Sequence, residues 1–204
     1  MITLQFLLTS LIVVLIPGTG VIYTVSTALV HGRRASLYAA IGCTAGIIPH
    51  LLATIFGLAA LMHTSALAFQ VLKYAGVLYL FYMAVMTWRD TTAFAIDENV
   101  ERSADVKLMG KAVLLNTLNP KLTIFFLAFL PQFVDPAAAG ALPQLLVLSA
   151  VFMAMTFGVF VVYGLVAHAF RSRVIDSPSA QRWMRNGFSA AFAGLGAKLA
   201  LSER

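Results

Sequence analysis

The ionisable side chains that we expect at membrane depth in this 204-residue sequence, where a charge is costly, are His50, Lys73, Lys121 and Lys198. Ionisable residues at membrane depth mark substrate or ion pathways by default. His50 is the candidate for proton coupling, because an imidazole changes its charge near neutral pH. The alternative is a neutral imidazole that hydrogen-bonds the backbone carbonyl freed by Pro49.

The three lysines differ in their expected depth. Lys121 follows a proline well inside its apolar run, so we expect its ammonium to attract a substrate carboxylate. Lys73 stands nearer the outer end of its run and is a candidate for the substrate pathway, with snorkelling to the interface as the alternative. Lys198 lies near the C-terminal end and is expected to snorkel outward.

Carboxylates are absent from the apolar runs. All eight acids fall in loops or at the tail: Asp90, Asp97, Glu98, Glu101, Asp105, Asp135, Asp176 and Glu203. A proton relay of the buried Asp/Glu type is therefore not expected, and coupled protons must move on histidine, lysine, water or the substrate. The sequence shows no H-E-x-x-H, G-x-S-x-G or phosphate-loop signature. We expect no enzyme activity and no catalytic residue. Because the histidines are scattered along the chain, we also expect no metal site, and we expect no cofactor.

Two helix-breaking clusters interrupt apolar runs at corresponding places. Pro17-Gly18-Thr19 interrupts the first run, and Asn119-Pro120-Lys121 interrupts the fourth. A proline lacks an N–H, so a carbonyl one turn earlier loses its donor; in lipid such a group is tolerated only against protein or a water-filled cavity. Free carbonyls bind ammonium groups, and half-helix N-termini bind carboxylates. These clusters, with Lys73, are the expected substrate pathway; the alternative is that both prolines are ordinary kinks.

Composition indicates a chain whose solvent is lipid. Hydrophobic residues make up 60% of it and charged residues 11%, against roughly 25% charged residues in a typical soluble domain. A membrane helix needs roughly 20 residues, and the apolar runs, of which the last is short, are Leu4–Val30, Leu37–Met62, Ala66–Trp88, Ala112–Val134, Leu142–Phe170 and Gly187–Leu201. We expect an all-α membrane protein of about six transmembrane helices.

Basic residues gather in alternate loops, which accounts for the net charge of +6 without nucleic acid as a partner. One side of the predicted arrangement carries only Arg204, and the other carries Arg33, Arg34, Arg89, Arg102, Lys107, Lys111, Arg171, Arg173, Arg182 and Arg185. The positive-inside rule places the larger group in the cytoplasm. We therefore expect a multi-pass protein of a bacterial-type cytoplasmic (inner) membrane, with both termini outside. Its partner is the lipid bilayer, and the sequence is compatible with a homo-oligomer.

The two breaks divide the chain into halves of three helices each. We expect residues 1–88 and 112–204 to form repeats, joined by residues 89–111 as a polar cytoplasmic connector. Because three is odd, the second repeat must be inverted relative to the first. In inverted-repeat transporters, broken helices meet near the midplane and frame the substrate site.

A series of short motifs follows one another along the chain: Pro17-Gly18-Thr19-Gly20, His31-Gly32-Arg33-Arg34-Ala35-Ser36, Gly42-x3-Gly46 with His50, Gly57-Leu58, Leu72-Lys73-Tyr74-Ala75-Gly76, Tyr79-Leu80 and Asn119-Pro120-Lys121. In this order they resemble the LysE/RhtB family of amino-acid exporters over nearly the whole chain. The resemblance implies export of amino acids driven by the proton-motive force. That family usually has a second proline after Pro-Gly, where this chain has Thr19.

These features predict a secondary transporter that exports amino acids or related small metabolites across the cytoplasmic membrane. One alternative is an ion channel or a transporter of another substrate, which rings of charge or a repeated carbonyl filter would favour. Another is a membrane assembly protein without transport activity. The Gly42-x3-Gly46 face is expected to pack closely against another helix.

Overall fold

The computed structural model describes residues 2–62, 66–89, 105–134 and 140–201, and within these ranges the chain forms helices and short turns without a strand. This confirms the predicted all-α class. The elements in chain order are α1 (Leu4–Leu15), α2 (Thr19–His31), α3 (Arg33–Ala45), α4 (Ile48–Met62), α5 (Ala66–Arg89), α6 (Asp105–Thr117), α7 (Pro120–Ile124), η1 (Phe125–Phe129, a π-helix), η2 (Leu130–Phe133, a 3₁₀ helix), α8 (Ala141–Leu165), α9 (Ala167–Phe170), η3 (Arg171–Ile175, a π-helix) and α10 (Pro178–Leu201).

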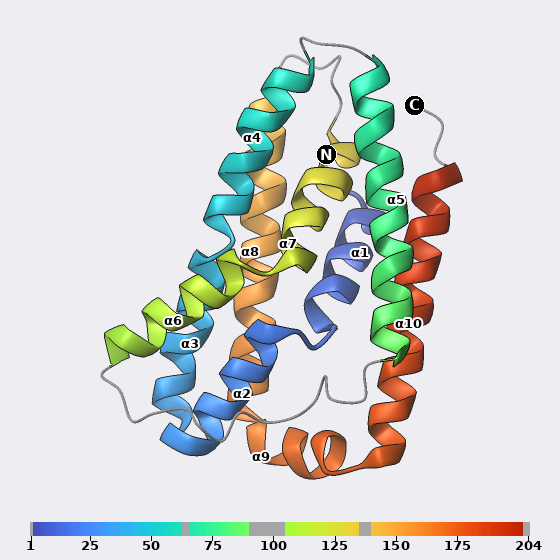
Figure 1. The fold of residues 1–204 in the computed structure, drawn as a ribbon. Coiled ribbons are helices and arrows are strands. Elements are labelled where there is room, and N and C mark those ends of the chain that lie inside the picture. Colours follow the sequence, from blue (N-terminus) through green and yellow to red (C-terminus); the bar gives the residue numbers. More distant parts are fainter. Residues whose placement is uncertain (1, 63–65, 90–104, 135–139, 202–204) are drawn as a thin grey trace.

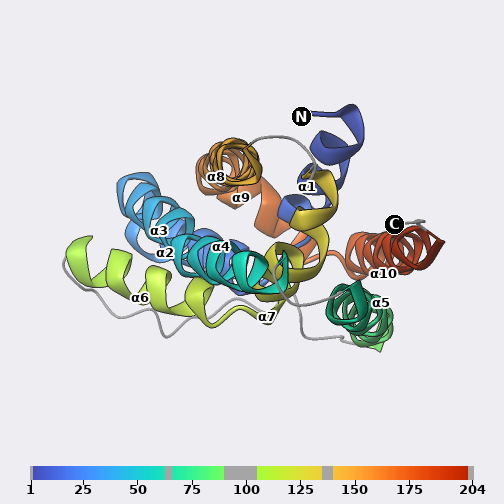
Figure 2. The same cartoon turned by 90° about the horizontal axis from the view of Figure 1, so that it is seen from above.

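The two short helices α1 and α7 lie in the middle of the molecule (Figures 1 and 2). α4 and α8 flank them on one side, and α5 packed against α10 flanks them on the other. In Figure 1, α3 and α4 run upward while α8 runs downward, and α5 runs downward while α10 runs upward. The helices of each of these two pairs therefore have opposite directions.

Two of the helical runs are broken at the predicted clusters. α1 meets α2 at 54°, and α6 meets the segment Lys121–Phe133 at 58°. α1 ends before Pro17, which has no N–H to continue the helical ladder. Pro120 occupies the first turn of α7, where its missing N–H has no helical acceptor to lose, and Asn119 caps that turn. Each proline thus ends one helical axis and allows another to begin.

The glycine face of α3 packs directly on α6, as its small-residue spacing predicted. A Cβ atom at Gly46 would lie 2.7 Å from the carbonyl oxygen of Val113, and one at Gly42 would collide with the carbonyl of Met109. Backbones can approach this closely only where side chains are absent. The contact fixes the end of α6, and with it Asn116, against α3 and α4.

Two described helices are long and apolar enough to cross a membrane: Arg33–Gly57, which contains α3 and the first part of α4, and Ala141–Leu165. The number rises to four when each bent pair is taken as one span. The six-helix inverted repeat remains a prediction. Outward-facing apolar side chains fit a membrane solvent; on α5 they include Val71, Tyr74, Leu78, Tyr82, Val85 and Trp88.

Two helices begin earlier than their apolar runs suggested. α6 begins at Asp105, inside the expected connector, because the acid suits the positive end of the helix dipole while Leu108 is buried. α10 begins at Pro178 rather than near Gly187 and has 24 residues. The polar residues that precede the apolar part of each run therefore extend its helix. Residues 90–104 of the expected connector lie outside the described residues.

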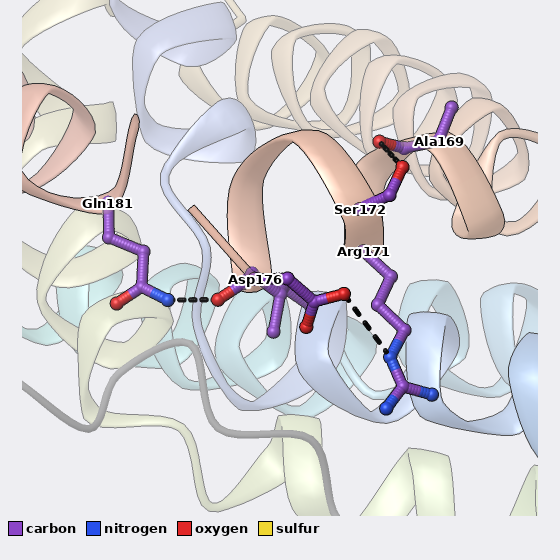
Figure 3. A network of polar contacts seen from close by, with 6 residues as sticks. Ala169, Arg171, Ser172, Asp176 and Gln181 are labelled. Atoms are coloured by element: carbon purple, nitrogen blue, oxygen red, sulfur yellow. Dashed lines mark hydrogen bonds and ion pairs between the residues drawn. The ribbon is translucent and has the colours of Figure 1, made fainter. Parts of the chain in front are cut away.

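A short network closes the turn between α9 and α10 (Figure 3). The N–H of Asp176 donates to the carbonyl of Arg171 at 2.8 Å, and the Arg171 Nε lies 3.7 Å from the Asp176 carboxylate. The Gln181 amide donates to the carbonyl of Ile175, which joins the turn to α10. This turn lies at the end of the molecule where α2 passes into α3 (Figure 1), so the basic residues of these elements share one end.

Candidate substrate site between two broken helices

The C-terminal end of α1 receives the ammonium of Lys121. Because Pro17 has no N–H, the carbonyl of Val13 has no helical donor. The Nζ of Lys121 donates to this carbonyl at 3.0 Å and to the carbonyl of Ile16 at 2.9 Å. Both carbonyls stand at the negative end of the α1 dipole, where a cation is favoured. Lys121 therefore joins the second break to the first across a sequence separation of 108 residues.

A second side chain from the C-terminal half also binds the end of α1. The hydroxyl of Tyr163, on α8, donates to the carbonyl of Leu15 at 2.9 Å. Helix ends leave carbonyls without intrahelical donors, and burial without a partner is costly. Lys121 and Tyr163 together supply donors for three carbonyls at this end.

At the break at Pro120, a carbonyl in the C-terminal half loses its helical donor and a basic side chain from the N-terminal half binds it. Pro120 leaves the carbonyl of Asn116 without its helical donor, and the Nε2 of His50, on α4, lies 3.0 Å from that oxygen. A carbonyl only accepts, so Nε2 carries the hydrogen. The N–H of Asn119 also reaches this carbonyl, at 3.2 Å. His50 thus bonds the carbonyl freed by Pro120 and not, as the alternative reading had it, the one freed by Pro49; the close packing of α6 on α3 and α4 is the reason.

The other ring nitrogen of His50 meets Thr123. Its Nδ1 lies 3.2 Å from the Thr123 hydroxyl, which also lies 3.4 Å from the carbonyl of Asn119. When His50 is neutral with its hydrogen on Nε2, the hydroxyl donates to Nδ1. When His50 is protonated, Nδ1 donates and the hydroxyl is free to donate to Asn119. The charge of His50 is therefore linked to the hydrogen bonding of the residue that caps α7.

Two asparagines hold the second break in place. The Oδ1 of Asn119 accepts from the N–H of Lys121 at 3.1 Å, and its Nδ2 donates to the Oδ1 of Asn116 at 3.3 Å. The Nδ2 of Asn116 in turn donates to the carbonyl of Cys43, on α3. Asn116 and Asn119 are both buried. This chain of amides fixes the start of α7 and hence the direction in which Lys121 leaves the backbone.

Two small cavities adjoin Lys121, and Val13 also lines both. The first is apolar and is lined by side chains of α5, η1 and α10, including Tyr79 and Phe192. The second lies between the breaks, beside Gly18, Asn119 and Phe152 among others. Each has a volume of about 20 Å³, which suits a water molecule rather than an amino acid. Neither of these two cavities is therefore large enough for an amino acid while the Lys121 side chain stays in place.

The structure brings together most of the residues that the sequence singled out. Pro17-Gly18, Asn119-Pro120-Lys121 and His50 all belong to the two breaks and their partners. Thr19 begins α2 but is exposed. Lys73 is on α5, and its side chain lies outside the described residues. These assignments as a substrate pathway remain a prediction.

Three partners at the breaks were missed from the sequence: Asn116, Thr123 and Tyr163. Asn116 had a readable signal, since it stands four residues before Pro120 and its carbonyl must lose a donor. Val13 has the same relation to Pro17. Tyr163 had no such signal, because its role depends on how α8 packs beside α1.

Comparison with known proteins identifies the family. The sequence profile of the LysE type translocators matches residues 11–203. This chain belongs to the LysE type translocator family. It is therefore a membrane protein of a transporter family, which agrees with its apolar helices.

Named relatives of this LysE type translocator cover almost its whole length. An uncharacterized membrane protein of Vibrio cholerae is 35% identical over 201 residues, 98% of this chain and 97% of the relative. A homoserine/homoserine lactone efflux protein of Salmonella typhimurium is 31% identical, and the match covers 96% of this chain and 94% of the relative. A leucine efflux protein of an Enterobacter species is 28% identical, and the match covers 92% of this chain and 90% of the relative. No solved structure matches the chain.

Proposed function

We propose that this LysE type translocator is a secondary transporter that exports amino acids or close derivatives across the cytoplasmic membrane, driven by the proton-motive force. One observation carries the proposal. The carbonyls that Pro17 and Pro120 leave without helical donors belong to the buried residues Val13 and Asn116 and are bound by basic side chains of the opposite half. Broken helices that meet in this way supply partial charges of both signs to a substrate.

The chemistry of the site suits an amino acid. The end of α1 presents carbonyl oxygens, which attract an ammonium group. α2 begins beside it at Gly18 without a side-chain cap, so its first N–H groups and Lys121 attract a carboxylate. Homoserine and its lactone, named for the Salmonella relative, share an α-amino group and differ in whether the carboxyl is free. An amino group is also present in leucine, named for the Enterobacter relative.

The proposed topology has six spans in two inverted repeats, with the basic end in the cytoplasm and both termini outside. The opposite directions of α3–α4 and α8, and of α5 and α10, support the inversion. The clustering of basic residues at the end formed by the start of α3, η3 and the start of α10 supports the orientation. Exposed apolar side chains along α5 support contact with lipid.

Proton coupling is assigned to His50. Its ring contacts the carbonyl of Asn116, the hydroxyl of Thr123 and, at 6.3 Å between centroids, the ring of Phe126. Gain of a proton reverses the bond to Thr123 and leaves the bond to Asn116 intact. A pH-dependent change is thereby delivered to the start of α7 without any carboxylate.

The test is efflux from liposomes that contain the purified full chain. Vesicles are loaded with single amino acids, their lactones or dipeptides, and release is followed with and without a pH gradient. We expect accelerated release of at least one amino acid, with a further increase when the gradient is imposed. The absence of accelerated release across the whole panel, in vesicles shown to contain folded protein, would refute the exporter assignment. Release that ignores the gradient would refute only the proton coupling.

A further inference from the structure

We propose that the ammonium of Lys121 is a tethered substitute for the substrate's amino group: it occupies the carbonyls of Val13 and Ile16 in the empty transporter and leaves them when the substrate binds. This inference rests on the proposed export function and adds the group by which the substrate is recognised. Substrates are then compounds with a primary ammonium, and a free carboxylate is not required.

The contacts of Lys121 are those of a bound primary amine. Its Nζ donates to two carbonyl oxygens at 3.0 and 2.9 Å, both at the end of α1. Among the described residues no Asp or Glu pairs with it. A lysine head and the α-ammonium of an amino acid are the same chemical group with three N–H donors. The carbonyls of Val13 and Ile16, which bind the lysine ammonium, are therefore also placed to bind the α-ammonium of an amino acid.

The ammonium of Lys121 occupies the place of a bound substrate ammonium on these carbonyls. The lysine lines two cavities beside Val13, each of about 20 Å³, and each of them has room for water and not for an amino acid. The substrate and the lysine head therefore compete for one place. The flexible four-carbon stem allows the head to withdraw while its backbone stays fixed by the cap at Asn119.

Gly18 keeps the space around the ammonium open. A Cβ atom at this position would lie 3.3 Å from the Nζ of Lys121 and 3.9 Å from the Nδ2 of Asn119. The glycine therefore borders the place that the lysine head now fills and the substrate would enter. The nearby wall contains Phe152 and Phe160, which suit the carbon skeleton of a substrate.

In the empty transporter, the Lys121 head also supplies a hydrogen-bond donor to the carbonyls that lack a helical donor. Without a substrate or a lysine head, the carbonyls of Val13 and Ile16 would be buried without donors, which is costly. The lysine satisfies them in the substrate-free state, and the substrate satisfies them in the loaded state. A displaced lysine head remains available to a substrate carboxylate when one is present.

The direct test is chemical rescue of the purified Lys121→Ala protein. The variant lacks the tethered amine, so n-butylammonium should bind to it and raise its melting temperature, whereas n-butanol at equal concentration should not. The association constant of n-butylammonium should be roughly tenfold or more higher for Lys121→Ala than for the wild type, which is the scale of one charge-assisted hydrogen bond. The matched control is Lys107→Ala, which removes an exposed lysine of α6 and should gain no such binding. Equal binding of n-butylammonium and n-butanol to folded Lys121→Ala would overturn the proposal.

A second measurement uses the wild type and does not depend on the variant's folding. Export of labelled leucine from vesicles is measured with leucine methyl ester or N-acetyl-leucine added as competitor. We expect inhibition by the ester, which keeps its ammonium, and none by the acetylated compound. Inhibition by N-acetyl-leucine and none by leucine methyl ester would overturn the proposal while leaving the export function intact. If n-butylammonium binds to Lys121→Ala as expected but the wild type exports no amino acid, the ammonium site is upheld and the proposed function is refuted.

Discussion

The ammonium of Lys121 lies 3.0 Å from the carbonyl oxygen of Val13, the acceptor that Pro17 leaves without its helical donor. The second break repeats this relation in reverse, with the imidazole of His50 on the carbonyl that Pro120 frees at Asn116. Each half of the chain thus supplies the basic side chain that binds the other half's orphan carbonyl. This reciprocity ties the two breaks into one structure at the centre of the molecule.

Replacing Pro17 by alanine should restore the helical donor to Val13 and straighten the junction of α1 and α2. Because Pro17 lies in the break between α1 and α2 and not inside either helix, its removal relieves no helix-interior strain, and we expect the melting temperature of Pro17→Ala to change little. Efflux should fall on the order of tenfold, the effect of losing about 1.4 kcal/mol of binding. Melting and efflux are measured on the same preparation. Unchanged efflux in a protein with normal melting would show that the break has no role in transport.

Removal of the Tyr163 hydroxyl should destabilise the protein, because the carbonyl of Leu15 loses its donor. We expect Tyr163→Phe to lower the free energy of unfolding by about 1–3 kcal/mol, the cost of a buried unsatisfied group. The control is Tyr82→Phe, at an exposed position of α5, which should change stability little. Equal stability of the two variants would contradict the assigned bond.

The His50→Gln variant separates hydrogen bonding from titration. A glutamine amide is able to donate to the carbonyl of Asn116 but does not change charge between about pH 5 and 8, the range in which histidine titrates. We expect the variant to fold and its efflux to vary less with pH over that range than efflux by the wild type. The measurement is the efflux rate at a series of pH values with the gradient held constant. A pH profile that matches the wild type would remove His50 as the proton-responsive group.

The contact between α3 and α6 is tested by a pair of glycine substitutions. Gly46→Ala places a Cβ atom 2.7 Å from the carbonyl of Val113, whereas a Cβ at Gly57 meets nothing within 4 Å. We expect Gly46→Ala to cost about 1–3 kcal/mol of stability through overpacking. Gly57→Ala should be neutral or stabilise by up to about 1 kcal/mol, because alanine favours the helix. Thermal or denaturant unfolding in detergent distinguishes the two, and similar losses for both would argue against the close contact.

The sequence was sufficient to predict the helical class, the positions of both breaks and the close packing of Gly42 and Gly46. These features depend on local rules: apolar length, the missing N–H of proline and the small size of glycine. The partners across the breaks were not predictable in the same way. The sequence predicted that the Lys121 ammonium attracts a substrate carboxylate, and this stays a prediction. Its bonds to the carbonyls of Val13 and Ile16 were not predicted. Its target is set by the approach of α7 to α1, which only the tertiary structure determines.

Helix starts show a second limit of the sequence. The apolar run began at Ala112, but α6 begins at Asp105, since a helix that packs one buried face continues through polar residues on its other faces. Hydropathy marks the part of a helix that suits lipid and does not mark where its hydrogen bonding begins. The same reasoning accounts for the start of α10 at Pro178.

The most direct test of the central claim compares net amino-acid efflux by the wild type, Lys121→Met and Lys107→Met in the same vesicles. Methionine keeps the length of the lysine stem and removes its charge, and Lys107 is an exposed lysine at the start of α6. We expect the wild type and Lys107→Met to accelerate efflux equally. Lys121→Met should lose net efflux, because the empty transporter then has no donor for the carbonyls of Val13 and Ile16. Wild-type rates from folded Lys121→Met would contradict the claim that the substrate site lies between the two broken helices.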